Sequence, residues 1–171
     1  MRVALRAQAT AALRVRWKDW VADPRHKHKH GRRVAEAVRP VFEEWVEGVK
    51  SHDLTFHAVQ ILSGHGCFGK YLHSIGKERT TCCWYCPEGA DTAQHTLEIC
   101  PEWTKERRAL RAQLGGHLSL PAVVAKLVRP GEEGRDNWRA FTFFASAVLR
   151  KKEADERVRR GEAAPPQSDS D

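Results

Sequence analysis

The sequence predicts an all-α fold, a small helical domain, on three observations. Apolar residues recur at spacings of three and four along most of the 171 residues, which is the period of a helix with one buried face. Proline and glycine stand where these stretches begin or end. No stretch alternates apolar and polar residues as a half-buried strand does. The length suits one domain, or one domain with a flanking arm.

The first predicted element is a basic helical arm and loop over residues 1–33. An apolar stripe at helical spacing runs through residues 2–21, and Pro24 ends the helix because proline has no N–H to donate. We interpret this stripe as the buried face of an ordinary packing helix rather than of a membrane-surface helix. Its members are Leu5, Ala9, Leu13, Trp17, Trp20 and Val21.

Positive charge is concentrated in this arm. It holds ten lysines and arginines against two acids, whereas the remainder of the chain is nearly neutral. Such a distribution is typical of a protein with a polyanionic partner, although charge alone does not separate nucleic acid from an anionic membrane or from a solvated basic face. No apolar run reaches the roughly 18 residues of a transmembrane helix. Arginines interrupt the N-terminal residues, so we expect no secretory signal and a reducing compartment.

A helical segment is predicted over residues 34–80. One apolar stripe extends from Val34 to Val49, and Pro40 within it predicts a kink or two shorter helices. A further short helix is expected over residues 54–62, before a glycine pair. Another turn or two of helix is expected shortly after that pair.

The C-terminal helices are predicted over residues 102–160. They comprise a helix that ends before two glycines, a short helix that Ser119 can cap, and a final helix that becomes purely charged from Arg150 onward. Residues 161–171 are small, polar and proline-containing, so they are predicted to form a disordered tail. The stripe of the final helix comprises Trp138, Phe141, Ala145, Val148 and Leu149.

The most informative segment, residues 81–101, contains a C-x2-C-x8-H-x4-C pattern. Zinc prefers four thiolate or imidazole ligands in a tetrahedron, and a C-x2-C turn brings two thiolates to one ion. Four protein ligands close the coordination sphere, so the pattern predicts one structural Zn²⁺ and a CCHC zinc knuckle. The four predicted ligands are Cys83, Cys86, His95 and Cys100.

The second ligand pair requires a helix that departs from regular geometry. Asp91 and Gln94 resemble the two ends of a capping box, which would place His95 in the first turn of a short helix. Cys100 lies five residues further, or about 140° around an ideal α-helix. The helix must therefore end or bend near Cys100, and Pro101 makes such a break plausible.

Several alternatives to this ligand set stay open. Cys82 could replace Cys83 in a C-x3-C arrangement, and a redox C-x2-C is disfavoured because the βαβ context of such motifs is missing. A second metal site could include His65, Cys67 and His73, but a fourth ligand is lacking and roles in the core or in a turn fit better.

An ordered series of short motifs carries a resemblance to a known family. The chain resembles the C-terminal end of the polyprotein of insect non-LTR retrotransposons of the R1 group, and the similarity covers most of its length. The matching motifs are Leu54-Thr55, Gly64-His65-Gly66-Cys67-Phe68, Tyr71-Leu72, Ile75-Gly76, Cys83-x2-Cys86, Asp91-Thr92-Ala93, His95-Thr96-Leu97 and Cys100-Pro101.

The resemblance implies a fragment, or a truncated or domesticated copy, of a reverse transcriptase and endonuclease polyprotein. The sequence contains no Tyr/Phe-x-Asp-Asp motif for polymerase metals and no recognisable endonuclease metal cluster, so we expect no enzymatic activity. The resemblance further implies nuclear action, RNA or DNA as the partner, and contact with the reverse transcriptase domain of the same polyprotein.

A zinc knuckle of this kind binds unpaired bases by stacking and phosphates by charge. Trp84 and Tyr85 lie between the first two ligands and are the candidates for stacking, although Trp84 could equally pack against a neighbouring helix. The cations near the knuckle, which include Arg107, are nearly balanced by acids, so the basic arm should supply most of the attraction. The predicted phosphate contacts are Lys77, Arg79, Arg14, Arg16, Arg32 and Arg33.

Two other function classes compete with a nucleic-acid-binding module. The zinc site could be purely architectural, with the chain serving protein–protein interaction with the polymerase body. A zinc hydrolase like the cytidine deaminases is disfavoured, because no H-x-E precedes a P-C-x-x-C.

Overall fold

The computed structural model describes residues 2–23, 31–49 and 53–162, and within them the fold is all-α. Eight α-helices account for most of these residues, and the only extended pairing among them is an isolated bridge between Cys82 and Ala90. The predicted fold class is therefore confirmed. None of the helices described is both long and apolar enough to cross a bilayer.

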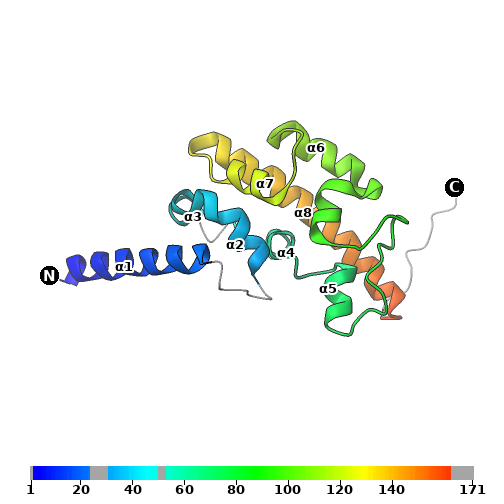
Figure 1. The fold of residues 1–171 in the computed structure, drawn as a ribbon. Coiled ribbons are helices and arrows are strands. Elements are labelled where there is room, and N and C mark those ends of the chain that lie inside the picture. The colour runs from blue at the N-terminus through cyan, green and yellow to red at the C-terminus, as the bar shows by residue number, and fades with distance from the viewer. Residues whose placement is uncertain (1, 24–30, 50–52, 163–171) are drawn as a thin grey trace.

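The longest of the described helices, α8 (Gly131–Arg159), runs along the body of the molecule (Figure 1). Helices α4 (Phe56–Ser63), α6 (Thr104–Leu114) and α7 (Leu120–Leu127) pack along it. The apolar stripe predicted for this helix is buried throughout, because it faces all three neighbours. At the start of α8, Gly134 lies against the backbone of the preceding turn, where a Cβ atom would collide with a carbonyl oxygen.

The segment before α4 divides at proline as the sequence predicts. Helix α2 (Arg32–Val38) passes into the short 3₁₀ turn η1 (Arg39–Val41), which contains Pro40, and the chain continues as α3 (Phe42–Gly48). The next short helix after α4 is α5 (Gly69–Ser74). One contiguous core joins all of these helices to the cysteine region and to α8, so residues 34–49 and 53–160 pack as one body.

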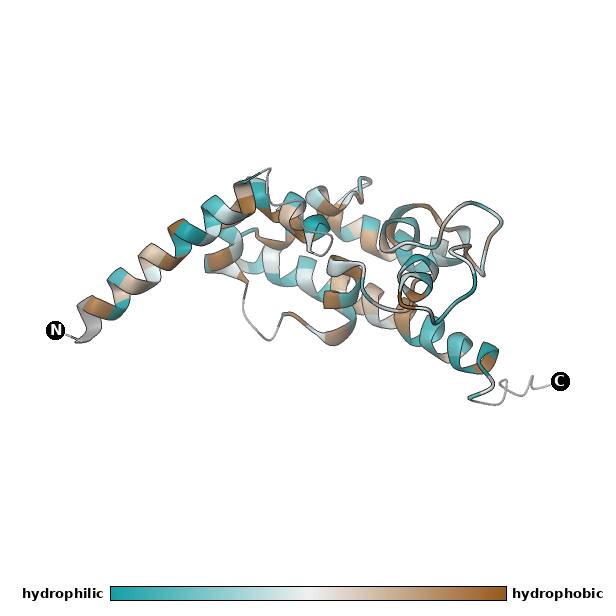
Figure 2. Ribbon diagram, turned by 60° about the horizontal axis from the view of Figure 1, so that its bottom comes forward, coloured by the Kyte–Doolittle hydropathy of each residue, from teal (hydrophilic) through white to brown (hydrophobic). Residues whose placement is uncertain are grey.

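Helix α1 (Arg2–Ala22) differs from the prediction, although its bounds agree. It projects from the body (Figures 1 and 2), and of its apolar stripe only Val21 is buried. Trp17 and Trp20 remain 47% and 43% exposed. The interpretation of the stripe as the buried face of a packing helix was therefore wrong for most of its length.

The second half of α1 is held against α3 by charge and one aromatic contact. Lys18 Nζ lies 2.7 Å from a Glu43 carboxylate oxygen, and Arg14 lies 3.3 Å from Glu47. The Trp17 ring meets the edge of the Phe42 ring at a centroid distance of 5.5 Å. These exposed ion pairs are individually weak, so the helix is oriented by several small contributions.

Two predicted segments lie outside the described residues, in whole or in part. These are the basic loop after Pro24, of which residues 24–30 are not described, and the tail, of which residues 163–171 are not described.

Candidate metal centre

Three thiols and one imidazole converge in the cysteine region. The segments that carry them, residues 82–100, lie at the end of the molecule opposite α1 (Figure 1). The ligand atoms of Cys83, Cys86, His95 and Cys100 all lie within 4.8 Å of one another. The sulfur of Cys100 is 3.9 Å from that of Cys83 and 4.0 Å from that of Cys86, and Cys86 Sγ is 3.3 Å from His95 Nε2.

These separations match the edges of a zinc tetrahedron. Zinc–sulfur bonds of about 2.3 Å and zinc–nitrogen bonds of about 2.0 Å give edges of roughly 3.8 Å between sulfurs and 3.5 Å between sulfur and nitrogen. Each of the three measured distances lies within a few tenths of an ångström of these edges. The four side chains can therefore hold one metal ion, and Cys₃His is a donor set typical of structural zinc.

The first two ligands come from a short hairpin-like loop. Its ends are joined by the Cys82–Ala90 bridge and by the Asp91 N–H, which donates to the carbonyl of Thr81 at 2.8 Å. Inside the loop the Tyr85 N–H donates to Cys83 Sγ at 3.4 Å, a contact that orients the sulfur and stabilises it as a thiolate. Cys82 is exposed and lies outside the cluster, so the geometry favours Cys83 as the ligand.

The second pair comes from a π-helical turn, η2 (His95–Ile99). The Cys100 N–H donates to the His95 carbonyl at 2.8 Å, an i to i+5 bond that widens the turn. A wider turn brings the fifth residue back toward the side of the first, which a regular α-helix does not do. This turn is the bend that the x4 spacing requires.

The cap of this turn is Thr92 rather than Asp91. Thr92 Oγ1 accepts from the His95 N–H at 2.9 Å, so the capping interaction starts one residue later than the sequence pattern suggested. Asp91 is instead buried and accepts from the Gly69 N–H at 2.9 Å. Gly69 is needed there, because a Cβ atom would lie 3.0 Å from the carbonyl oxygen of Cys82.

Asp91 and Lys152 form a buried ion pair that ties the metal loop to α8. The Lys152 ammonium lies 2.8 Å from both carboxylate oxygens, and its side chain is 2% exposed. It also lies over the rings of Phe68 and Tyr85, at 5.5 Å and 5.2 Å from their centroids. The end of α8 that becomes purely charged from Arg150 onward is thus docked on the loop.

Arg107 holds the other side of the metal centre. Its guanidinium donates to the carbonyls of Thr96, Leu97 and Cys100, at 3.2, 3.1 and 2.5 Å. The carbonyls of Thr96 and Leu97 lie at the end of the π-turn, and that of Cys100 also accepts from the Trp103 N–H at 3.3 Å. Arg107 therefore caps the end of the turn and fixes the backbone of a ligand. Because its side chain is buried, Arg107 is not available to phosphates, unlike the other cations counted near the knuckle.

In the metal-free cluster, burial shifts the pKa values of three of the four candidate ligands. It raises the pKa of Cys100 to about 12 and also raises the pKa of Cys83, whereas it lowers the pKa of His95. The imidazole is therefore ready to coordinate, but the thiols of Cys83 and Cys100 carry protons at neutral pH. Binding of a metal ion releases those protons.

The two aromatic residues of the loop have different surroundings. The Tyr85 hydroxyl donates to Asp155 at 2.6 Å, and its ring lies 4.9 Å from Trp103 and below Lys151. Trp84 is 57% exposed, with the Arg159 guanidinium 4.8 Å from its ring centroid. Tyr85 thus anchors the loop, and Trp84 is the aromatic surface that remains accessible.

The predicted phosphate contacts are distributed over three regions. Lys77 and Arg79 are exposed in the segment that precedes the loop, near the metal centre. Arg16 is exposed on α1, and Arg14 on the same helix pairs with Glu47. Arg32 pairs with Glu36 at 2.7 Å, and Arg33 is half-buried, with its Nη1 donating to Gln94 at 3.0 Å.

The residues weighed for a second metal site do not converge. Cys67 Sγ lies 3.4 Å from a carboxylate oxygen of Glu156, His65 stacks on Tyr71, and His73 Nδ1 faces the carbonyl of Glu78. Among the residues that the structure describes, the four-ligand cluster is the only group found that could hold an ion.

Comparisons of the chain with models of protein families, with characterised proteins and with solved structures find no match.

Proposed function

We propose that the chain is a non-catalytic, zinc-dependent nucleic-acid-binding module. In this proposal it belongs to the C-terminal end of a polyprotein of the R1-type non-LTR retrotransposons, acts in the nucleus, and positions template RNA or target DNA for the reverse transcriptase. The ordered motif series around the four metal ligands supports the family, and the concentration of positive charge supports a polyanionic partner.

The observation that carries the proposal is the position of Trp84 beside the metal cluster. Zinc bound by Cys83 and Cys86 would rigidify the turn that presents this indole ring, which is 57% exposed. An exposed, immobilised ring is a platform on which any unpaired base can stack. The exposed cations Lys77 and Arg79 are close along the chain and would meet the phosphates.

Binding of labelled single-stranded RNA and DNA by the zinc-loaded chain tests the proposal. We expect affinity to fall steeply with salt, by a log–log slope of about −0.7 for each phosphate contact. Trp84→Ala should weaken binding about tenfold, because base stacking on an aromatic ring contributes on the order of 1–3 kcal/mol. Phe56→Ala, which removes another exposed ring far along the chain, is the matched control and should leave affinity unchanged.

A second candidate is a structural zinc module that binds protein, with the polymerase body as its partner. The exposed apolar residues of α1 favour it, since Leu5 and Leu13 are 58% and 65% exposed on a helix that projects from the body. Undetectable or salt-insensitive binding of both oligonucleotides by the zinc-loaded chain would contradict nucleic-acid binding and favour this candidate.

A further inference from the structure

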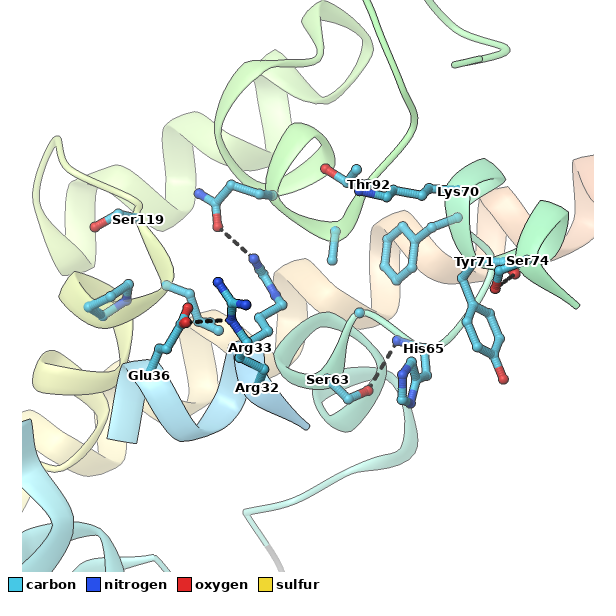
Figure 3. Close-up of a pocket in the computed structure, with 16 residues that line it drawn as sticks. Arg32, Arg33, Glu36, Ser63, His65, Lys70, Tyr71, Ser74, Thr92 and Ser119 are labelled. Carbon is cyan, nitrogen blue, oxygen red and sulfur yellow. Dashed lines mark hydrogen bonds and ion pairs between the residues drawn. The ribbon is translucent and has the colours of Figure 1, made fainter. Parts of the chain in front are cut away.

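A cavity of about 590 Å³ lies between α2, the end of α4, α5, the turn at residues 92–94 before η2, and the start of α7 (Figure 3). This volume is in the range of pockets that hold a small organic ligand. Five separate elements contribute to its wall, so its shape depends on the tertiary fold rather than on one loop. It is separate from the metal centre, which has no residue in its lining.

The wall of this cavity is positively charged. It contains three cations, Arg32, Arg33 and Lys70, and a single acid, Glu36. The acid is already paired with Arg32 at 2.7 Å. Lys70 is exposed and makes no side-chain ion pair or hydrogen bond with any residue that the structure describes. Two positive charges therefore remain without a compensating anion.

Arg33 is the most unusual of these groups. Its Nη1 donates to Gln94, but its Nε and Nη2 are buried and have no hydrogen-bond partner. A buried guanidinium with unused donors is costly, because neither water nor protein replaces its lost hydration. An anion in the adjoining cavity would supply the missing charge, in a setting where the low dielectric strengthens the attraction.

The glycine turn after α4 borders the cavity beside this arginine. Gly64 has a φ of +76°, and a Cβ atom there would lie 3.5 Å from Arg33 Cδ, an ordinary van der Waals contact. A side chain at this position would be strained by the left-handed backbone rather than by lack of space. The first glycine of the Gly-His-Gly motif therefore permits the turn that lines the cavity.

An aromatic pair lies at the same cavity. The rings of His65 and Tyr71 are stacked, with centroids 4.9 Å apart and planes inclined by 28°. Figure 3 shows both side chains on the side of the cavity opposite Ser119, with Arg32 and Arg33 between them. A flat ring surface near two uncompensated cations matches the two chemical parts of a nucleotide, a base and a phosphate.

We infer that this cavity binds one nucleotide of a single-stranded nucleic acid, with its phosphate toward Arg33 and Lys70 and its base against the Tyr71–His65 pair. The inference rests on the proposed nucleic-acid binding and adds a subsite to it. The cavity extends from α2 to α5, and α5 packs beside the metal loop, where the Gly69 N–H donates to Asp91 (Figure 1). A strand that occupies the cavity therefore lies close to the metal loop.

Two substitutions in the full zinc-loaded chain test the subsite against a matched control. Arg33→Met should weaken single-stranded oligonucleotide binding about tenfold or more, because it removes charge-assisted contacts. Lys70→Gln should weaken binding a few-fold and reduce the salt slope by about 0.7. Arg129→Gln removes an exposed cation beyond the far end of α7 and should change affinity by less than about twofold.

Thermal unfolding separates binding from folding in the Arg33 variant. Because methionine removes an uncompensated buried charge and keeps most of the volume, the unfolding midpoint of Arg33→Met should be unchanged or higher. A higher midpoint together with weaker binding would support a ligand site. A lower midpoint with unchanged oligonucleotide affinity would assign Arg33 a structural role and overturn the inference.

Titration with a nucleoside 5′-monophosphate, followed by amide NMR, locates the subsite directly. Shifts of the Gly64 and Gln94 amides in the unmodified chain, absent in Arg33→Met and with the unphosphorylated nucleoside, support the inference. Shifts that inorganic phosphate reproduces in full would show an anion site without base contact and overturn it. If the monophosphate causes no shifts while Trp84-dependent oligonucleotide binding persists, the subsite is overturned but the proposed function is not. If the chain binds the monophosphate but no oligonucleotide, both proposals are contradicted.

Discussion

At the scale of single residues, two cations occupy positions that apolar residues normally fill. Lys152 continues the stripe Phe141, Ala145 and Val148 at helical spacing, and it is buried as that spacing predicts for a core position. Arg107 stands in the same way between Trp103 and Leu110. The sequence therefore contains a signal for both residues, namely a charged residue at a core position of an apolar stripe. This signal does not say which oxygen atoms accept from the charged group.

Loss of one partner from the Asp91–Lys152 pair should be strongly destabilising. Lys152→Met leaves the Asp91 carboxylate buried without its cation, and we expect the free energy of unfolding to fall by about 3–5 kcal/mol. Urea unfolding of the zinc-loaded chain measures the change. Lys151→Met is the matched control: this neighbouring side chain is 50% exposed, and its loss should cost about 1 kcal/mol or less. Equal losses in the two variants would contradict the role assigned to the buried pair.

At the scale of elements, the helices could be predicted and the metal centre only partly. Apolar spacing predicted the helical segments, Pro40 predicted the division between α2 and α3, and the C-x2-C-x8-H-x4-C spacing predicted which four side chains meet. The π-turn could not be predicted as such, because the local spacing requires a bend without saying which kind, and Arg107, which donates to the carbonyls of the turn, belongs to another helix. Thr92 as the cap was missed since Asp91 fits the same local pattern.

The role of Arg107 can be tested by a change that keeps its charge. Lysine cannot span three carbonyls, so Arg107→Lys should loosen the turn that carries His95 and Cys100. We expect zinc affinity, measured by competition with a chromophoric chelator, to fall about 10–100-fold, as is typical when an outer-shell partner is lost. Arg108→Lys, at the exposed neighbouring position, should leave zinc affinity unchanged. An unaltered affinity in Arg107→Lys would show that the π-turn does not need this clamp.

At the scale of the whole molecule, the metal centre and helix α1 lie at opposite ends of the body (Figure 1). The apolar stripe of α1 predicted a helix correctly but not its exposure, because a sequence does not reveal whether a partner surface exists within the same chain. The core between the two ends is built mainly from α4, α6, α7 and α8. Its contacts are apolar, so we expect this core to stay folded without the proposed metal ion, unlike the loop.

Removal of the metal should therefore unfold one end of the molecule before the other. We expect a chelator to abolish amide protection in residues 81–100 and to lower it at the C-terminal end of α8, while the part of α8 around Phe141 and Phe144 stays protected. Hydrogen exchange measures this directly. Uniform loss of protection along the chain would contradict the separation.

The metal-free chain should also depend on pH in a defined direction. Since burial raises the pKa of the Cys83 and Cys100 thiols in the folded state, the unfolded state loses these protons first. The stability that these thiols contribute is complete below about pH 9 and is lost as the pH rises toward the folded value. Denaturant unfolding of the metal-free chain at increasing pH checks this expectation, and a rise in stability above pH 9 would contradict it.

The two halves of helix α8 must also keep a fixed rotation about the helix axis relative to each other. Its first half fills the core and its second half carries Lys152, Asp155 and Arg159 to the metal loop. Each residue of an α-helix advances the side chains by about 100°. A single residue inserted between the two halves would leave both helical but would rotate the charged half away from the loop. An insertion of seven residues would nearly restore the orientation of the charged half, while shifting it about 10 Å along the helix axis. Because α8 is uninterrupted, the packing of its first half in the core fixes the direction in which its second half presents charged side chains to the metal loop.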